Sequence, residues 1–265
     1  GAIDAAMAHR LFGRQLGLPP LVHHEDGFNE DEQAKLKPQR NWYRRLALAR
    51  AAKLVVPSRT LENIALDSWH IPADRLANIP NGVDTAQFDQ VPRSDALPGI
   101  RKAEGELWVG TLAGLRRVKN LPALVRAFAR LDSCWKLIIV GEGPEESAIR
   151  AQATTLGIGD RVHLPGFVPN PSQYVGLFDI FALSSDTEQF PISVVEAMAA
   201  GIAVVAPAVG DIAHMVSAEN AALIAHAGDE AALADCLLAA AESPDLRAGA
   251  GLANRTKARS DFDQT

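Results

Sequence analysis

Short apolar runs alternate with helix-like stretches along the chain, and this alternation constrains the fold more than any other feature of the sequence. Residues 136–140 read Lys-Leu-Ile-Ile-Val, as expected of a strand that is buried on both faces of a sheet. Strands that recur with helices between them predict an α/β fold with parallel sheets covered by helices. The predicted strands span residues 18–23, 54–58, 76–79, 107–112, 136–140, 161–164, 180–183 and 203–206. The predicted helices span 41–52, 59–68, 121–131, 144–156, 191–200 and 229–242.

A cluster of turn-forming residues predicts a domain boundary near residues 92–99, where Pro92, Pro98 and Gly99 occur and the apolar periodicity stops. The expected organisation is an N-terminal domain, a C-terminal domain and a last segment that returns toward the first domain, spanning residues 1–95, 100–245 and 246–265. The N-terminal part has three predicted strands, too few for an ordinary covered parallel sheet, so we expect that domain to be incomplete.

The composition excludes several classes of protein. The 265 residues are 48% apolar and 22% charged, which is typical of a globular chain. A net charge of −6 argues against nucleic acid as a partner. Two cysteines, Cys134 and Cys236, make a disulfide framework unlikely and favour a reducing cytoplasm. The sequence has neither an apolar run near the roughly 18 residues of a membrane span nor a signal-peptide pattern.

Two glutamates flank the predicted start of the helix over residues 191–200. Glu188 comes just before Pro191, which suits a first helical turn, and Glu196 lies inside the helix, which Gly201 ends. The helix follows a predicted strand, so its start lies at the sheet edge where open α/β folds bind ligands and where free N–H groups favour a phosphate. Two carboxylates so placed could hold hydroxyls on either side of a pyrophosphate. An alternative is that they only complement the helix dipole.

Three cations follow the predicted strand over residues 107–112. Arg116, Arg117 and Lys119 precede a predicted helix, and cations in such a loop could neutralise a diphosphate leaving group. A solvated basic turn is the simpler interpretation of this motif when it is taken alone. The next loop, Val-Gly-Glu-Gly-Pro at 140–144, lacks the last glycine of a dinucleotide fingerprint, because Glu146 stands there.

These motifs, in this order, resemble family 4 of the retaining glycosyltransferases. The resemblance rests on Ile-Pro-Asn-Gly-Val-Asp at 79–84, Lys-Asn at 119–120, Val-Gly-Glu-Gly-Pro at 140–144, Leu-Pro-Gly-Phe-Val at 164–168, and the Glu188–Glu196 pair followed by Ala-Met-Ala-Ala-Gly. Each motif is weak alone, and the ordered set is specific. It implies a GT-B fold of two Rossmann-like domains, with a nucleotide-sugar donor on the C-terminal one, and a reaction that needs no metal.

The resemblance also implies a role for individual residues. Glu188 matches the glutamate on the donor sugar, Glu196 the one on the ribose hydroxyls, and Lys119 the lysine on the phosphates. Other matches are the loop against the base, with Phe167 and Val168, and the segment whose amides approach the phosphate, with Phe190, Pro191, Ile192, Ser193 and Val194.

The sequence departs from the family pattern at two places. Members usually carry an arginine where this chain has Gly114, so the usual arginine–lysine clamp requires that Arg116 or Arg117 replace that arginine. The front region that normally carries a glycine-rich loop and a histidine facing the donor sugar has no counterpart here. His23 and His24 match the end of a later strand that borders the cleft, and we take His24 as a catalytic candidate, although lone histidines are more often structural.

A basic segment lies within the N-terminal part. Residues 34–53 hold seven cations and no acid, interleaved with Trp42 and Tyr43. Such a helix could rest on anionic lipid at the inner face of the membrane, and a solvated helix face is the slightly favoured alternative. The seven cations are Lys35, Lys37, Arg40, Arg44, Arg45, Arg50 and Lys53.

We therefore expect a cytoplasmic glycosyltransferase that moves a sugar, with retention, from a UDP- or GDP-sugar to a saccharide or lipid-linked acceptor. No metal and no cofactor are expected. The alternatives are a nucleotide-sugar 2-epimerase on the same fold and a non-catalytic module that binds nucleotide sugars.

Overall fold

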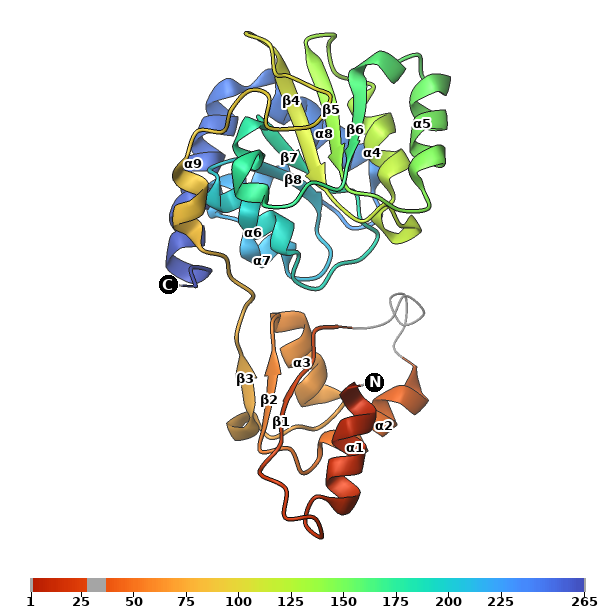
Figure 1. Cartoon of the computed structure of the whole chain (residues 1–265), viewed down its shortest axis with the longest axis vertical. Coiled ribbons are helices and arrows are strands. Elements are labelled where there is room, and N and C mark those ends of the chain that lie inside the picture. The colour runs from red at the N-terminus through yellow and green to blue at the C-terminus, as the bar shows by residue number, and fades with distance from the viewer. Residues whose placement is uncertain (1, 28–36, 265) are drawn as a thin grey trace. The chain divides into compact units, whose positions relative to one another are not determined.

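A computed structural model describes residues 2–27 and 37–264, in two compact units, Gly1–Asn81 and Gly82–Thr265 (Figure 1). In both units every pair of neighbouring strands is parallel, which confirms the fold class predicted from the alternation of strands and helices.

The N-terminal unit is built on a three-stranded sheet in the order β1-β2-β3. Its strands are β1 (Val22–His24), β2 (Lys53–Val56) and β3 (Leu76–Asn78), and its helices are α1 (Ala2–Phe12), α2 (Pro38–Leu48), α3 (Arg59–Asp67) and the short η2 (Ala73–Arg75). The core brings together Leu48 from α2, Leu54 from β2 and Leu61 from α3, with Trp69 fully enclosed beside them.

Two predicted elements of this unit have different bounds in the structure. The strand predicted over 18–23 is confined to β1, because Pro19 and Pro20 cannot donate ladder hydrogen bonds. The helix predicted over 41–52 begins earlier, at Pro38, a residue that suits a first helical turn. Helix α1 was not predicted; only Ala6 on it is fully buried, so it lacks a strong apolar stripe.

The C-terminal unit contains a six-stranded sheet in the order β6-β5-β4-β7-β8-β9. In chain order the strands are β4 (Leu107–Leu112), β5 (Trp135–Val140), β6 (Val162–Gly166), β7 (Ile180–Ala182), β8 (Ala203–Pro207) and β9 (Ile224–Ala225). The order reverses next to β4, because the chain runs outward from β4 to β6 and then returns to its other side with β7. Such a switch point is where open α/β sheets bind ligands beyond the strand ends.

Helices cover both faces of this sheet (Figure 1). One face is packed by α4 (Leu121–Phe128), α5 (Glu146–Thr155) and α8 (Glu230–Glu242), and the other by α6 (Ile192–Ala199), α7 (Ile212–Met215) and the end of α9 (Pro244–Asp261). Short 3-10 turns connect these elements: η3 (Thr85–Asp89), η4 (Arg117–Lys119), η5 (Gly159–Arg161), η6 (Pro171–Gln173), η7 (Val175–Leu177) and η8 (Ala218–Leu223).

The long helix α9 has no counterpart among the predicted helices. It carries Gly249 and Gly251, which lower helix propensity, but a Cβ on Gly251 would lie 2.1 Å from the carbonyl oxygen of Gly201. The glycine therefore lets α9 approach the turn between α6 and β8. Residues 82–99, which precede and include the predicted boundary, also belong to this unit, because Phe88 and Leu97 are buried in its core.

Candidate functional site

Two loops are tied together at the carboxyl edge of the larger sheet. One follows β4 and contains η4, and the other follows β7. The Ser184 hydroxyl donates to the carbonyl oxygen of Lys119 at 2.9 Å, and the amide of Asp186 donates to that of Val118 at 2.9 Å. The Asn120 side chain, whose backbone is left-handed, donates to Asp186 Oδ1 at 2.9 Å. These bonds bring the two predicted charged motifs into one place.

Lys119 and Glu188 form an ion pair within this edge. Lys119 Nζ lies 2.5 Å from Glu188 Oε1, and the side chains are 20% and 11% exposed. The buried Ser185 hydroxyl donates to the same oxygen at 2.7 Å. Oε2 of Glu188 has no hydrogen bond to any residue that the structure describes. One carboxylate oxygen is therefore held by two donors, and the other is available to a ligand.

Glu196, on α6, has a different environment. Across the described residues, no hydrogen bond or ion pair reaches its carboxylate. Burial raises the pKa of Glu196 from 4.5 to about 7, because the charged form loses hydration without gaining a partner. Its charge and the burial of the phenol raise the pKa of Tyr174 well above 10, with burial as the larger cause. A half-buried carboxyl group without a partner is a candidate ligand-binding group.

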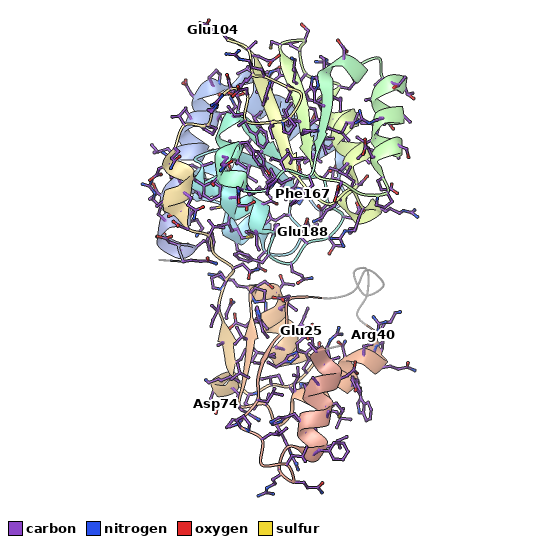
Figure 2. The ribbon with its side chains drawn as sticks, viewed as in Figure 1. Glu25, Arg40, Asp74, Glu104, Phe167 and Glu188 are labelled. Atoms are coloured by element: carbon purple, nitrogen blue, oxygen red, sulfur yellow. The ribbon has the colours of Figure 1, made fainter. Side chains whose placement is uncertain are left out.

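A cavity of about 530 Å³ opens between the ends of β4, β5 and β6, and Tyr174, which interacts electrostatically with Glu196, is one of its lining residues. Phe167, which is 67% exposed, and Val168 lie in its wall, as does Gly114. Figure 2 shows Phe167 and Glu188 at the same end of the unit, the end toward which the strands point in Figure 1. The hydroxyl of Tyr174 donates to the carbonyl oxygen of Val168 at 3.1 Å, and this hydrogen bond joins two residues of the cavity wall.

Glycines allow the loops around the cavity to come close. The backbone φ of Gly141 is +144°, and a Cβ there would lie 1.9 Å from the carbonyl oxygen of Ala113. Any side chain at this position would separate the loop after β5 from the loop after β4. The motif over 140–144 therefore makes a tight turn that shapes the cavity.

The segment before α6 is held mainly by its side chains. Phe190 packs edge-on against Phe262 with ring centroids 5.4 Å apart, while Pro191 and Val194 are buried. Ile192 is 46% exposed and Ser193 is half-buried. With Phe190 and Val194 in the core, any contact of theirs with a ligand would use backbone atoms. Pro191 caps the helix instead of starting it.

Arg116 and Arg117, in the loop after β4, are both exposed. The Nε atom of Arg116 lies 3.4 Å from the position that a Cβ on Gly114 would take. The guanidinium thus lies over the glycine that lines the cavity. No comparable contact is recorded for Arg117.

His24 belongs to the N-terminal unit, at the end of β1. Its ring nitrogen lies 3.2 Å from Asp26, and its side chain is 48% exposed, whereas the neighbouring His23 is buried and lies 3.3 Å from Glu25. The structure gives His24 an acidic partner and access to solvent, and its role stays a prediction.

The predicted basic segment over 34–53 is only partly available for a membrane. Lys35 lies outside the described residues. Arg44 is buried, with its guanidinium 5.7 Å from the centre of the Trp69 ring, and Lys53 donates to the carbonyl oxygen of Asp74 at 2.7 Å. Trp42 is 65% exposed and Arg45 is exposed. Arg44 is therefore a packing residue and not part of a surface cluster.

Among residues 2–27 and 37–264, no group of three or more histidine, cysteine or acidic side chains is placed to hold a metal ion. Within the same ranges, no helix is long and apolar enough to cross a membrane.

Sequence reasoning missed the roles of Ser185 and Tyr174. Both are polar and buried, and both bind a group at the site, at Glu188 and Val168 respectively. The available signal was a hydroxyl placed directly after a predicted strand, in the case of Ser185. Tyr174 gave no such signal, because its partner is a backbone carbonyl.

A parallel sheet with helices on both faces, a switch point beside β4 and charged loops at the carboxyl edge defines a Rossmann-like α/β protein with a ligand site at that edge. The comparisons with known proteins make this class specific. The sequence pattern of the family "Glycosyl transferases group 1" matches residues 94–257, and that of "Glycosyltransferase Family 4" matches residues 3–87. The chain belongs to the group 1 glycosyl transferases, as its motifs predicted.

A longer protein of known structure superposes on nearly all of this chain. The crystal structure of Anabaena HepE in complex with UDP superposes with a TM-score of 0.82 at 23% identity, over 99% of this chain and 72% of that one. The fold is therefore GT-B, with two Rossmann-like domains, as the resemblance implied.

Curated relatives are longer than this chain. The N-acetyl-alpha-D-glucosaminyl L-malate synthase of Bacillus anthracis is 28% identical over 254 residues, which are 94% of this chain and 65% of that protein. The N-acetylgalactosamine-N,N'-diacetylbacillosaminyl-diphospho-undecaprenol 4-alpha-N-acetylgalactosaminyltransferase of Campylobacter jejuni is 30% identical over 156 residues, 58% of this chain and 41% of that protein. The chain thus spans about two fifths to two thirds of the length of these relatives.

Proposed function

We propose that this chain carries the donor-binding machinery of a glycosyltransferase that moves a sugar from a nucleotide sugar to an acceptor. The observation that carries the proposal is the pairing of Lys119 with Glu188 across two loops at the carboxyl edge of a parallel sheet, with the unpartnered Glu196 on the helix that follows the second loop. Names of curated relatives support a transferase over an epimerase or a binding module.

Each charged group suits one part of such a donor. Lys119 supplies the cation for the diphosphate, which gains negative charge as the bond to the sugar breaks. Glu196 suits the ribose hydroxyls, because two hydroxyl donors would compensate its buried charge. Glu188 suits the transferred sugar through its available Oε2.

The remaining contacts of the donor come from backbone and apolar groups. Phe167 and Val168 form a wall of the cavity against which a flat base could lie. Backbone N–H groups within residues 190–193 face a phosphate in this proposal, except at Pro191, which has none, and the N–H of Val194 donates to the carbonyl oxygen of Pro191 at 3.0 Å. Phe190 and Val194 are anchored in the core.

Arg116 is the better candidate for a second phosphate cation. Its guanidinium lies over Gly114 at the cavity, a position that a side chain at residue 114 would otherwise fill. With Lys119 it would neutralise the leaving diphosphate, a task that other transferases give to a divalent metal. We therefore propose a metal-independent reaction, in which added EDTA leaves the rate unchanged.

The reaction proposed is transfer with retention of the anomeric configuration. The anomeric carbon passes through a state resembling an oxocarbenium ion, and stabilisation of the leaving phosphate is the main contribution of the protein. UDP is the first nucleotide to test, since a solved relative is bound to UDP, and GDP is the second. A saccharide or lipid-linked acceptor is proposed, in line with the undecaprenol-linked substrate in one relative's name, and His24 with Asp26 is proposed to face that acceptor.

We place this enzyme in the cytoplasm, in keeping with its two free cysteines, with peripheral contact to anionic lipid through the exposed cations of 37–53.

The test begins with binding. Thermal melts of the chain against UDP, GDP and their sugar derivatives should show a rise in Tm that grows with ligand concentration. Transfer is then measured with the full-length protein, and nuclear magnetic resonance of the product reports the anomeric configuration. A chain that is stabilised by neither nucleotide would contradict the proposal.

A further inference from the structure

The ion pair between Lys119 and Glu188 joins two groups that the proposed function assigns to different parts of the donor. Lys119 is assigned to the diphosphate and Glu188 to the sugar, yet without a ligand they bind each other at 2.5 Å. Lys119 is therefore not a free cation waiting for a phosphate, because its charge is already neutralised by a carboxylate of the same site.

The environment makes this pairing more consequential than a surface salt bridge. The two side chains are 20% and 11% exposed, so their attraction is less screened than between exposed groups. In the described part of the chain, the recorded side-chain partners of Glu188 are Lys119 and Ser185. A phosphate that draws Lys119 away removes the cation that pairs with the Glu188 carboxylate among the described residues, and it places a like charge beside that carboxylate.

Ser185 keeps Glu188 in place when this happens. Its buried hydroxyl donates to Oε1 from the end of β7, and this bond does not involve Lys119. Glu188 therefore stays at the site with Oε2 available. A donor that carries a sugar offers a hydroxyl to this oxygen, and a nucleoside diphosphate does not.

We propose that Glu188 is a specificity-determining residue that competes with the diphosphate for Lys119, so that the spent nucleotide binds less tightly than the intact donor. The inference rests on the proposed function. With the donor, Glu188 exchanges Lys119 for a sugar hydroxyl. After transfer the nucleotide has no sugar, and Glu188 regains Lys119 as the diphosphate leaves.

The test measures the affinity for a nucleoside diphosphate, which needs no knowledge of the sugar. Calorimetry uses UDP, or GDP if the parent binds it more tightly. The change Glu188→Gln keeps the size of the side chain and the acceptor for Ser185 and removes the competing charge. It should tighten binding roughly three- to tenfold.

A double-mutant cycle distinguishes competition for Lys119 from simple repulsion between the Glu188 carboxylate and the diphosphate. In a Lys119→Ala background there is no lysine to compete for, so Glu188→Gln should give a markedly smaller gain. Asp186→Asn is the matched control: it removes a charge from the same loop, but the Asp186 carboxylate accepts from Asn120 and not from Lys119. It should change the affinity less than Glu188→Gln does.

The outcomes are distinct. An unchanged or weakened affinity in Glu188→Gln, while the parent binds the nucleotide, overturns this inference and leaves the proposed function standing. An equal gain with and without Lys119 also overturns it, because simple repulsion would then suffice. If the parent binds neither nucleotide, the proposed function fails, and this inference fails with it.

Discussion

The loop before α6 and the helix α6 itself each carry a glutamate, and the two carboxylates have different partners. Before α6, Glu188 has a cation and a hydroxyl on one oxygen. Within α6, Glu196 is half-buried with neither, and its pKa is raised to about 7 by loss of hydration. The first arrangement is stable without a ligand and must be opened by one. The second is unfavourable without a ligand and is relieved by one. A protein that only needed stability would have little reason to keep the second.

The largest expected effect comes from removing the cation that pairs with Glu188, so that this carboxylate, like that of Glu196, has no ion-pair partner. Lys119→Ala leaves Glu188 with Ser185 alone and removes the proposed phosphate cation. UDP affinity should fall roughly ten- to hundredfold in calorimetry, as expected for a charged hydrogen bond. Lys102→Ala is the control, because Lys102 also forms a half-buried ion pair, at 2.7 Å from Asp179, before β7. Equal losses in the two variants would contradict a specific role of Lys119.

The second effect comes from removing the unpartnered charge. Because the pKa of Glu196 is raised in the folded state, the folded protein holds a proton that the unfolded chain releases between about pH 4.5 and 7. Stability should therefore fall as pH rises through this window and stay level above it. Glu196→Gln should remove this fall and be more stable than the parent at pH 8, by up to about 3 kcal/mol.

Urea unfolding at pH 5 and pH 8 measures this difference, and Glu242→Gln, on the exposed surface of α8, is the control. The same variant should bind UDP less tightly than the parent at pH 8. A parent and variant with parallel pH profiles would show that Glu196 pays no desolvation cost.

A smaller effect is expected from the tyrosine beside Glu196. Tyr174→Phe removes the hydrogen bond to the carbonyl oxygen of Val168 and leaves the packing of the ring. It should cost about 1 kcal/mol of stability and weaken UDP binding roughly two- to fivefold, because the cavity wall is less firmly held. Tyr43→Phe removes a hydroxyl that donates to Asp4 in the other unit, and UDP binding should not change. If Tyr174→Phe bound UDP as the parent does, the wall would be held by packing alone.

The smallest effect concerns buried and exposed cations on α2 and just after it. Arg44 is buried against Trp69, whereas Arg45 and the nearby Arg50 are exposed. The double change Arg45→Glu and Arg50→Glu should abolish co-sedimentation with anionic vesicles, and binding of the parent should fall as salt rises. Arg44→Glu should instead destabilise the fold. Equal binding of the parent to neutral vesicles would argue against the electrostatic account.

Much of the fold could be predicted from local patterns. The strand over 107–112 has the predicted bounds, and the helix over 59–68 is α3 to within one residue. Both have strong local signals: an apolar run in the first case, and a serine cap at Ser58 that accepts from Leu61 in the second. The helix α9 escaped prediction because its two glycines oppose a helix locally, and the close packing against Gly201 accounts for one of them, Gly251.

The sequence by itself determined the family, the parallel α/β architecture and the charged groups that we propose for a nucleotide-sugar site, because apolar periodicity and motif order are local properties of the chain. Tertiary structure decided how those groups are charged and paired. Lys119 and Glu188 come from different loops and meet only when β4 and β7 lie side by side. The pKa of Glu196 rises only when folding removes water from its carboxyl group. Burial and long-range pairing both depend on the folded arrangement of segments that are distant in sequence.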